Sequence, residues 1–598
     1  MKQSISHVMK NNIELFKLCF QTAPGYVIYF MSVHIRTALS VFIEYTICFN
    51  YVLECVEFGR PFKDAALFIG GLLIAVFISL LFDANMYGRI QAKYHPLIQM
   101  RLKEKLYQKA KEIDLSCYDG PGFYNEYILV VSESDKQIDR IFDILGKVSD
   151  GLTLAILSLG FIIATDSVSM IFVFVSFTLI FMTGKKIANL NFKIRVEKNP
   201  AERRIDYLKR LFYLNDYAKE IRLNTDVSNE LLKDFDKACD ESLEVDQKTV
   251  YKRLRLEFLR TYVFNEFIFN IVFISYLAFK AVVLGQISFS NVVVLHGTAN
   301  RTRNRLYPVA EAYPQAQEIS MYMDKIHSFL ALKPTIVSQG NQQIPEVPTK
   351  IELRNVSFKY GKNDDYVLQN INMTLSPYSK TAIVGYNGAG KTTLTKLIMR
   401  LYDPDEGEIL LNGINIKEYQ INDYRRKIGA VFQDFKIFAA TVKENVLLDF
   451  ANKGSDEAVL DALDKSGAFS RVNTLSNGIN TELTTEFEKN GVNLSGGEGQ
   501  KVAIARVFYS DSNLILLDEP SSALDPIAEY QLNNSMLTAA ENKSVLFISH
   551  RLSTTRQADK IYMLENGRII EEGSHTQLLM INGKYAEMWR AQAMNYIG

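Results

Sequence analysis

Cysteines are few, net charge is zero and no cleavable signal is evident in this 598-residue chain, and each absence excludes a class of protein. The five cysteines are scattered and none forms a Cys-x-x-Cys pair, which argues against a thiol-based metal or redox centre. Basic and acidic residues number 67 each, so the sequence lacks the basic footprint of a nucleic-acid-binding protein. The N-terminal region is polar and carries lysines, which suits a start in the cytoplasm.

Long hydrophobic runs are absent from the second half of the chain and fill the first half. This asymmetry predicts an α-helical membrane domain fused to a soluble domain. A short amphipathic helix at about 13–21 is expected to lie on the membrane surface. About six membrane spans are expected, at about 26–53, 65–87, 141–164, 168–188, 258–284 and 288–330.

Two long charged stretches, 89–140 and 193–257, separate the spans. They are rich in helix formers, so we expect helices that continue beyond the bilayer, interrupted near 116–124 and 213–217. The basic residues concentrate in these stretches, and the positive-inside rule therefore places both long loops and both termini in the cytoplasm.

The sixth segment carries three arginines, Arg301, Arg303 and Arg305, within a length that should cross the membrane. Three arginines at a helix centre cost roughly 8–10 kcal/mol on the insertion scale, so this segment cannot face lipid alone. In a helix, Arg301, Asn304 and Arg305 share one face and Arg303 lies on the opposite side. If the helix starts near 288, Arg301 lies roughly 20 Å along it, in the inner half of the bilayer.

Two interpretations of these arginines remain open. In the first, a polar stripe lines a water-filled cavity and attracts an anionic cargo, with Glu44 and Glu266 as further lining residues. In the second, the arginines are structural: they pair with intramembrane carboxylates or mark where the helix leaves the membrane. Glu44, Glu266 and Asp83 are the expected partners in that case.

A linker at about 333–348 contains Pro, Gln and Gly without periodicity and divides the chain. The membrane domain is expected to cover 1–332 and the soluble domain 349–598. The soluble domain alternates strand-like and helix-like patterns, which predicts an α/β nucleotide-binding fold.

The strongest local signal is Gly385-Tyr-Asn-Gly-Ala-Gly-Lys-Thr392, which fits the phosphate-binding loop G-x-x-x-x-G-K-[ST]. An apolar, β-prone run at 381–384 precedes it and a helical pattern at 394–400 follows it, the context that this loop requires. Its glycines let backbone N–H groups approach a phosphate, and the helix N-terminus favours the anion.

Further motifs follow in a fixed order, and Tyr360 lies upstream of the loop. An apolar strand at 514–517 ends in Asp518 and Glu519, and another strand, at 546–549, ends in His550. Between the loop and these strands lie Gln433 and the glycine-rich run Leu494-Ser-Gly-Gly-Glu-Gly-Gln500. This set resembles the ATP-binding cassette (ABC) family, specifically exporter-type half-transporters that fuse a membrane domain to an α/β P-loop ATPase domain. The resemblance covers nearly the whole chain.

The resemblance implies ATP as the nucleotide and Mg²⁺ as its metal ion. Tyr360 would stack on the adenine, while Thr392, Gln433 and Asp518 would hold Mg²⁺. The implied phosphate-binding residues are Gly385, Asn387, Gly388, Gly390, Lys391, Thr392 and Thr393.

The implied chemistry is hydrolysis. Glu519 would act as the general base on the attacking water, and His550 would contact the γ-phosphate and position Glu519. Gln433 would also join the metal site to the surface where exporters place their coupling helices. The breaks near 119–122 and 215–217 match the places of those helices.

The glycine-rich run would act as the family's signature in trans, so the resemblance implies a dimer with two composite ATP sites. Asp525 would lie at the dimer contact. Glu498 stands where the family usually has Gln, and homodimer and heterodimer both remain open. The implied signature residues are Ser495, Gly496, Gly497 and Glu498.

The cargo is less defined. The run 495–530 resembles bacterial exporters of modified peptides and antibiotics, and the charged sixth segment suits a polar or anionic cargo. Too few residues precede the first span for a protease domain, which disfavours a leader-cleaving exporter. We expect ATP-driven export across a bacterial plasma membrane. A lipid-linked flippase or an exporter-fold importer is the alternative, and a non-pumping nucleotide-gated channel or sensor is disfavoured by the complete hydrolytic set.

Overall fold

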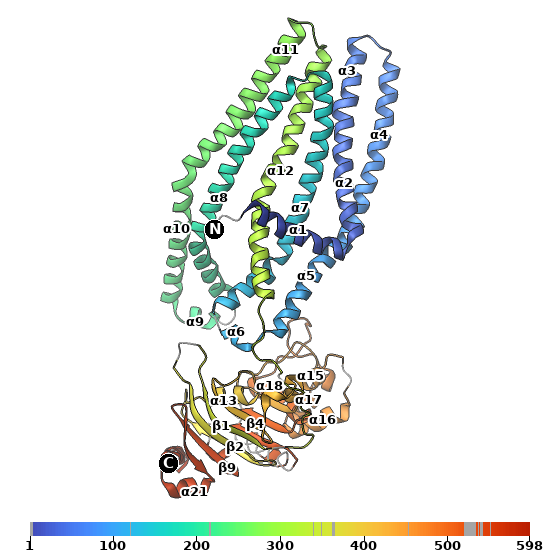
Figure 1. Ribbon diagram of the computed structural model, residues 1–598. Coiled ribbons are helices and arrows are strands. Elements are labelled where there is room, and N and C mark those ends of the chain that lie inside the picture. The colour runs from blue at the N-terminus through green and yellow to red at the C-terminus, as the bar shows by residue number, and fades with distance from the viewer. Residues whose placement is uncertain are drawn as a thin grey trace. The chain divides into compact units, whose positions relative to one another are not determined.

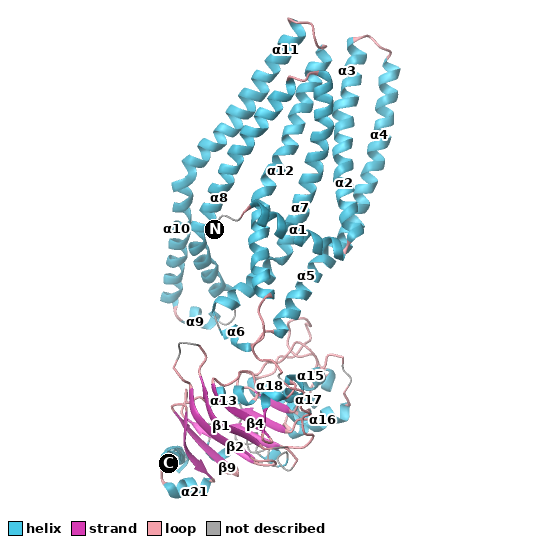
Figure 2. Ribbon diagram, in the orientation of Figure 1, coloured by secondary structure: helices cyan, strands magenta, loops and turns pink. Residues whose placement is uncertain are grey.

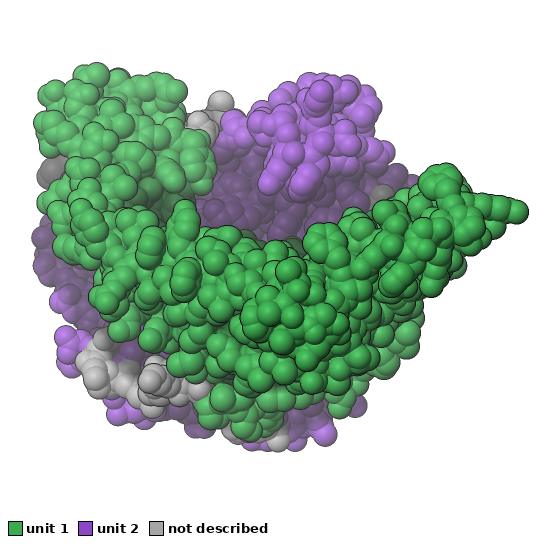
Figure 3. Space-filling view, turned by 90° about the horizontal axis from the view of Figure 1, so that it is seen from above, with its two compact units in different colours: residues 1–111, 125–332 green, residues 112–124, 333–598 purple. Residues whose placement is uncertain are grey.

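The computed structural model describes residues 4–119, 121–214, 217–338, 340–348, 350–361, 365–451, 454–519, 534–535, 538, 542–549 and 552–597. The chain forms two compact units, coloured separately in Figure 3. The first, Met1–Lys111 with Asn125–Leu332, is helical. The second, Glu112–Tyr124 with Lys333–Gly598, contains both sheets. The expected fold class is therefore confirmed.

The first unit consists of long helices that run side by side (Figures 1 and 2). Some of them contain π-helical segments, labelled η1, η2 and η4, and the helix continues without a break on both sides of each segment. The elements are α1 (Ile5–Thr22), α2 (Pro24–Phe42), η1 (Ile43–Cys48), α3 (Phe49–Glu57), α4 (Phe62–Asn85), η2 (Met86–Gln91), α5 (Ala92–Glu112), α7 (Pro121–Thr165), α8 (Ser169–Tyr213), α9 (Ala218–Leu223), α10 (Thr225–Phe258), η4 (Leu259–Phe273), α11 (Ile274–Val282) and α12 (Phe289–Leu330).

Within the described residues, five continuous helices are long and apolar enough to cross a membrane. They are Pro24–Glu57, Phe62–Glu112, Tyr127–Thr165, Ser169–Tyr213 and Thr225–Val282. The sixth long helix, α12, packs against α8, α1, α3 and α11, and its polar middle keeps it out of this apolar class. This agrees with the expectation that the arginine-bearing segment cannot face lipid alone.

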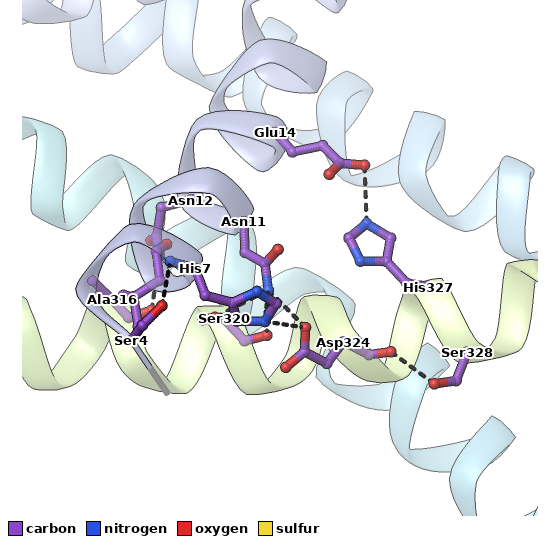
Figure 4. A network of polar contacts seen from close by, with 11 residues as sticks. Ser4, His7, Asn11, Asn12, Glu14, Ala316, Ser320, Asp324, His327 and Ser328 are labelled. Carbon is purple, nitrogen blue, oxygen red and sulfur yellow. Dashed lines mark hydrogen bonds and ion pairs between the residues drawn. The ribbon is translucent and has the colours of Figure 1, made fainter. Parts of the chain in front are cut away.

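Helix α1 begins at Ile5, earlier than the expected start near residue 13, because the Ser4 side chain accepts a hydrogen bond from the His7 backbone N–H and caps it. Its polar face docks on α12 (Figure 4). The buried Asn11 amide donates to the Ser320 carbonyl at 3.0 Å and to Asp324 at 2.8 Å.

Two histidine–carboxylate pairs flank this contact. His7 pairs with Asp324 at 2.9 Å, and His327 pairs with Glu14 at the same distance. The opposite face of α1 exposes Ile5, Met9 and Ile13 by 58–64%. Helix α1 is thus amphipathic, as expected, with a polar side fixed to α12 and an apolar side left open.

The second unit contains two sheets. The strands are β1 (Ile351–Phe358), β2 (Leu368–Leu375), β3 (Lys380–Gly385), β4 (Glu406–Leu411), β5 (Ile414–Asn415), β6 (Ile428–Val431), β7 (Leu514–Asp518), β8 (Ser544–Ile548), β9 (Lys560–Glu565) and β10 (Arg568–Gly573). Strands β2-β1-β4-β5 form an antiparallel sheet. Strands β10-β9-β3-β8-β7-β6 form the other, parallel except for β10 at its edge.

The parallel strands are mostly apolar and buried because helices cover both faces of such sheets. All residues of β7 and β8 are buried, and β3 is buried from Thr381 to Gly385. The covering helices include α13 (Lys391–Ile398) and α18 (Gly496–Tyr509). In such sheets ligands bind beyond the carboxyl ends of the strands, and β3 and β7 end in the sequence motifs.

The other helices that the structure describes in this unit have at most 14 residues. They are α6 (Leu115–Asp119), η5 (Ile416–Glu418), α14 (Ile421–Arg426), α15 (Val442–Leu447), α16 (Asp456–Lys465), α17 (Phe469–Asn473), η6 (Gly478–Asn480), α20 (Leu552–Thr555), α21 (His575–Ile581) and α22 (Lys584–Ile597).

The segment Glu112–Tyr124 belongs to the second unit although its chain neighbours are the long helices of the first. Asp114 accepts hydrogen bonds from the Thr335 backbone N–H at 2.5 Å and from the Thr335 hydroxyl at 2.7 Å. The Tyr402 hydroxyl donates to Asp119. Two carboxylates therefore fix this segment, which contains α6, to the α/β unit.

Candidate nucleotide site

The phosphate-binding loop lies between β3 and α13, as the sequence predicts. Gly390 has a φ of 101° and caps α13, a conformation that few residues other than glycine adopt. A Cβ at Gly390 would lie 2.7 Å from a Leu368 methyl carbon, so a side chain there would clash. The glycine spacing thus lets the backbone turn tightly around the place where a phosphate binds.

Lys391 is the first residue of α13 and is 6% exposed. Its Nζ donates to the Gly385 and Tyr386 carbonyls, at 3.0 Å each. Burial lowers the pKa of Lys391, and the nearby Glu519 and Asp518 oppose that effect. Two loop carbonyls thus hold the Lys391 ammonium group at the loop, where it can compensate phosphate charge.

Asp518 and Glu519 follow one another at the end of β7, where Asp518 is buried. Glu519 has a φ of 51°, a left-handed conformation that is uncommon for glutamate and is often found at functional sites. Its backbone N–H donates to the Ile548 carbonyl of β8 at 3.1 Å. The Gln433 amide donates to the Glu519 carboxylate at 3.0 Å. The two motifs predicted from distant parts of the sequence therefore meet.

Lys391, Gln433 and Glu519 line one cleft of about 730 Å³, and the buried Asp518 precedes Glu519 in the chain. The size of this cleft is typical of small-molecule sites. Thr392, Gln433 and Asp518 offer hydroxyl, amide and carboxylate oxygens, the donors that Mg²⁺ takes in proteins. The cleft is lined by Val367, Asn387, Gly388, Gly390, Lys391, Thr392, Thr393, Gln433 and Glu519.

Tyr360 lies near the phosphate loop, and its hydroxyl lies 3.0 Å from the Thr393 hydroxyl. Its ring packs edge-on against Phe358 and Tyr402, with ring centres 5.1 and 5.5 Å apart. Tyr360 remains 40% exposed, whereas Tyr402 is buried. The cluster supports Tyr360 from behind and leaves part of its surface open for a flat ligand.

The glycine-rich signature forms the start of α18. Ser495 caps the helix, accepting from the Glu498 N–H at 3.3 Å, while the Glu498 carboxylate accepts from the Ser495 N–H at 2.8 Å. This is a reciprocal capping box. Gly496 and Gly497 form the first turn beside it. Glu498 also pairs with Arg471 of α17, 2.8 Å away.

Sequence reasoning missed three residues of this unit: Tyr402, Arg471 and Gln500. The buried Gln500 side chain donates to the Glu519 carbonyl at 3.3 Å. Gln500 stands at the end of the signature run, but nothing in that run indicates which backbone group it would meet. Two predicted residues, His550 and Asp525, lie outside the described residues.

The arginines of α12 contact three different helices. Arg305 pairs with Asp150 of α7 at 2.5 Å, a partner that the sequence did not indicate. Asp83, expected to pair with these arginines, instead pairs with Arg36. Asp150 and Arg305 are far apart in the sequence, so only the folded bundle reveals the pairing.

The other two arginines lie over aromatic rings. Arg301 lies 4.4 Å from the centre of the Tyr45 ring in η1, and Arg303 lies 4.3 Å from that of Phe269 in η4. Both rings belong to π-helical segments, which are frequent at functional sites. Arg301 and Arg303 point to different helices, as expected.

The other residues predicted for this region, Asn304, Glu44 and Glu266, lie on the same helical segments as these contacts. Asn304 lies within hydrogen-bond distance of Asn300 and accepts from Arg303. Glu44 belongs to η1, next to Tyr45, and Glu266 in η4 accepts from the Asn270 amide at 2.9 Å.

The fold and the nucleotide site define an ATPase domain of the ATP-binding cassette class joined to a helical domain. Residues 368–522 match the ABC transporter family. The subtilin transport ATP-binding protein SpaT of Bacillus subtilis is 29% identical over 527 residues, which cover 86% of this chain and 85% of SpaT. The nisin transport ATP-binding protein NisT of Lactococcus lactis subsp. lactis is 27% identical over 592 residues, which cover 96% of this chain and 95% of NisT.

An ATP-dependent lipid A-core flippase of Methylobacillus flagellatus is 34% identical over 287 residues, covering 48% of each chain. A solved structure of a bacterial Atm1-family ABC exporter with ATP bound covers 96% of this chain and 98% of its own, with a TM-score of 0.75 and 22% identity, and shares the fold. Residues 368–522 thus form an ABC transporter domain, the whole chain shares the fold of an ABC exporter, and the protein is an ATP-hydrolysing transporter.

Proposed function

We propose that this chain forms half of a dimeric exporter that uses ATP and Mg²⁺ to move a peptide or a small polar or amphiphilic cargo by alternating access. The observation that carries the proposal is the Gln433–Glu519 contact beside Lys391 in one cleft. Phosphoryl transfer needs charge compensation, a metal and an oriented water, and this cleft brings together groups for all three.

Each side chain has a distinct task in this mechanism. Lys391 compensates phosphate charge, and Thr392, Gln433 and Asp518 would hold Mg²⁺, which would supply further positive charge for phosphoryl transfer. Glu519 accepts the proton of the attacking water, and its left-handed backbone directs the carboxylate into the cleft. Tyr360 stacks on the adenine.

The test is Glu519→Gln, which keeps the shape of the side chain but cannot accept a proton. We expect nucleotide binding to persist and hydrolysis to fall by about 10²–10⁴-fold, the range for a lost general base. Fluorescent-nucleotide binding and phosphate release on the purified full chain measure the two steps separately. Normal turnover in this variant would remove Glu519 from the role.

The signature acts in trans in this proposal, so the working unit has two cassettes, in a homodimer or a heterodimer. Ser495, Gly496 and Gly497 open α18 and leave an N-terminal turn that favours an anion. Native mass spectrometry of the complex from its own cell distinguishes two identical chains from two different ones. A monomer that hydrolyses ATP at full rate would contradict the composite site.

We propose a bacterial plasma membrane as the location, because five helices in the described part of the chain are apolar enough to cross one and the relatives are bacterial. Helix α1 would rest its open apolar face on the cytoplasmic leaflet. The long polar ends of α5, α8 and α10, and the ATPase domain, would lie in the cytoplasm.

The cargo proposal rests on α12 and on the relatives. Arg301 lies over the Tyr45 ring and is partly exposed, so a peptide or another anionic group can meet its charge. Arg303, in contrast, is buried and donates hydrogen bonds to Asn300 and Asn304. Two long relatives are named for subtilin and nisin transport. ATP-dependent uptake of a labelled peptide into inside-out vesicles, lost in Arg301→Ala, is the expected result.

A lipid-linked flippase is the second candidate, because one relative is named as a lipid A-core flippase. Peptide export and lipid flipping can be distinguished by reconstituting the protein into vesicles that contain a fluorescent anionic lipid, in place of the peptide. ATP-dependent movement of lipid, without peptide uptake, would favour the flippase.

A further inference from the structure

The residue at position 498 places a negative charge at the start of α18, where an ABC signature usually has a neutral amide. In the proposed dimer this end of α18 faces the triphosphate held by the other cassette. A carboxylate there would repel the phosphates, since like charges within a few ångströms of one another are unfavourable even near a surface. The chain must therefore offset this charge.

Arg471 is placed to do so. It comes from α17, a different helix, and its guanidinium Nε lies 2.8 Å from the Glu498 carboxylate. A hydrogen bond from Arg471 to the Thr474 hydroxyl at 3.2 Å helps to hold the guanidinium in place. Both partners keep exposed surface, 42% for the Arg471 side chain and 30% for that of Glu498, so the pair lies at the open surface of the signature.

The capping geometry does not by itself require a charge. At the third helical position either Glu or Gln can bond back to the N-cap backbone. Glutamine would thus preserve the contact with Ser495, which now measures 2.8 Å, and would need no cation beside it. The arginine is explained by the charge of Glu498 and not by the cap.

We propose that Arg471 is a positioning residue of the signature, which neutralises Glu498 so that the first turn of α18 can accept the γ-phosphate of ATP bound to a second cassette. This inference rests on the proposed composite site and adds a residue to it. Within this chain, the Glu498–Arg471 pair replaces the single neutral amide of the family pattern.

The experiment compares ATP hydrolysis by the full chain in lipid nanodiscs for the wild type, Arg471→Met, Glu498→Gln and the double variant. Removing the arginine leaves the carboxylate uncompensated, so the KM for ATP should rise roughly fivefold, about the upper limit for a partly exposed charge pair. Removing the carboxylate leaves a free cation near the phosphates, so that KM should fall. The double variant should return toward the wild type.

Opposite signs of the two single changes separate compensation from a purely structural contact. A structural pair predicts that both single variants are impaired and that the double variant is no better, and this result would overturn the inference. The effect of Arg471→Met should also shrink as salt is raised, because salt screens exposed charges. An unchanged KM in Arg471→Met would likewise overturn it.

Controls keep the result interpretable. Arg471→Lys retains the charge and should restore most of the affinity even if Arg471→Met loses some stability. Lys465→Met removes an exposed cation that pairs with Asp461 on the neighbouring α16 and should leave the KM unchanged. Failure of the proposed function is recognised separately, as equal hydrolysis by the wild type and Glu519→Gln.

Discussion

The hydroxyl of Tyr402 donates a hydrogen bond to the carboxylate of Asp119. Tyr402 belongs to the α/β fold, whereas Asp119 ends α6, a short helix that the chain forms between two long helices. The Tyr402 ring also packs edge-on against Tyr360, whose hydroxyl lies 3.0 Å from that of Thr393 in the phosphate-binding motif. One tyrosine thus joins α6 to the residue expected to meet the adenine.

Substitution of Tyr402 should separate its two contacts. Tyr402→Phe keeps the ring beside Tyr360 and loses only the hydrogen bond to Asp119, so we expect an unchanged KM for ATP and reduced ATP-dependent uptake into vesicles. Tyr402→Ala also removes the ring support, so the KM should rise. Steady-state hydrolysis and vesicle uptake measure these effects, and Asp119→Ala should reproduce the phenylalanine result.

If Tyr402→Phe instead raises the KM as much as Tyr402→Ala does, the hydroxyl supports the nucleotide site itself, and α6 has no separate connection through this residue.

Gln500 should affect turnover more than nucleotide affinity. Its amide donates to the Glu519 carbonyl and helps to hold a left-handed backbone that glutamate rarely adopts. Gln500→Met keeps the length of the side chain but removes the donor and leaves the partly buried Glu519 carbonyl less well satisfied. We expect kcat to fall roughly tenfold, since losing such a bond costs about 1–3 kcal/mol, with little change in KM.

The control for this change is the thermal stability of the same variant. An unchanged melting temperature with reduced kcat would place the effect at Glu519, whereas an unchanged kcat would show that the Glu519 backbone does not depend on Gln500.

Asn11 should determine how firmly α1 is attached to α12. It is 2% exposed and donates to the buried Ser320 and to Asp324, so Asn11→Ala removes the donor that meets the Ser320 carbonyl, at a cost of about 1–3 kcal/mol. Asn11→Asp should be worse because it sets a carboxylate beside Asp324. Faster hydrogen–deuterium exchange of residues 5–22 in both variants is the expected result.

Lys10→Ala, on an exposed part of the same helix, is the matched control. Equal protection of α1 in all three variants would mean that its apolar face, not this polar contact, holds the helix.

The Glu498 cap should make stability depend on pH in acid. The Ser495 backbone N–H, with help from Arg471, holds the pKa of Glu498 below its ordinary 4.5. The folded state therefore gains stability from this group above pH 4.5 and loses it as the pH falls through the lowered value. The melting temperature of Glu498→Gln should lie below that of the wild type near pH 7, and the difference should narrow below pH 4.5.

The melting temperatures can be measured by the fluorescence of a dye that binds unfolded protein. A difference between the two proteins that stays constant across this pH range would show that the cap does not depend on ionisation of Glu498.

The sequence was sufficient wherever neighbours in the chain determine the geometry. The strand, the glycine turn and the helix around Lys391 are local, and the apolar run ending at Asp518 requires burial on both faces. These features were predicted correctly because periodicity and glycine spacing report directly on local conformation.

Partners that meet only in the folded state could not be predicted. Arg305 and Asp150 lie on different helices, and so do Arg471 and Glu498. Helix periodicity indicates which face a residue occupies but not which helix covers that face. The early start of α1, which Ser4 caps, was missed because the polar residues of its first turns are also held by α12, more than 300 positions away in the chain.

The chain passes between its two units three times, after residues 111, 124 and 332. A protease that cuts the linker after Leu332 would therefore sever only one of three connections. Asp114 and Asp119 would still bind the α/β unit through Thr335 and Tyr402. Two gene fragments encoding 1–332 and 333–598, expressed together, should thus reassemble into one particle, with residues 112–124 of the first fragment serving as the docking peptide for the second.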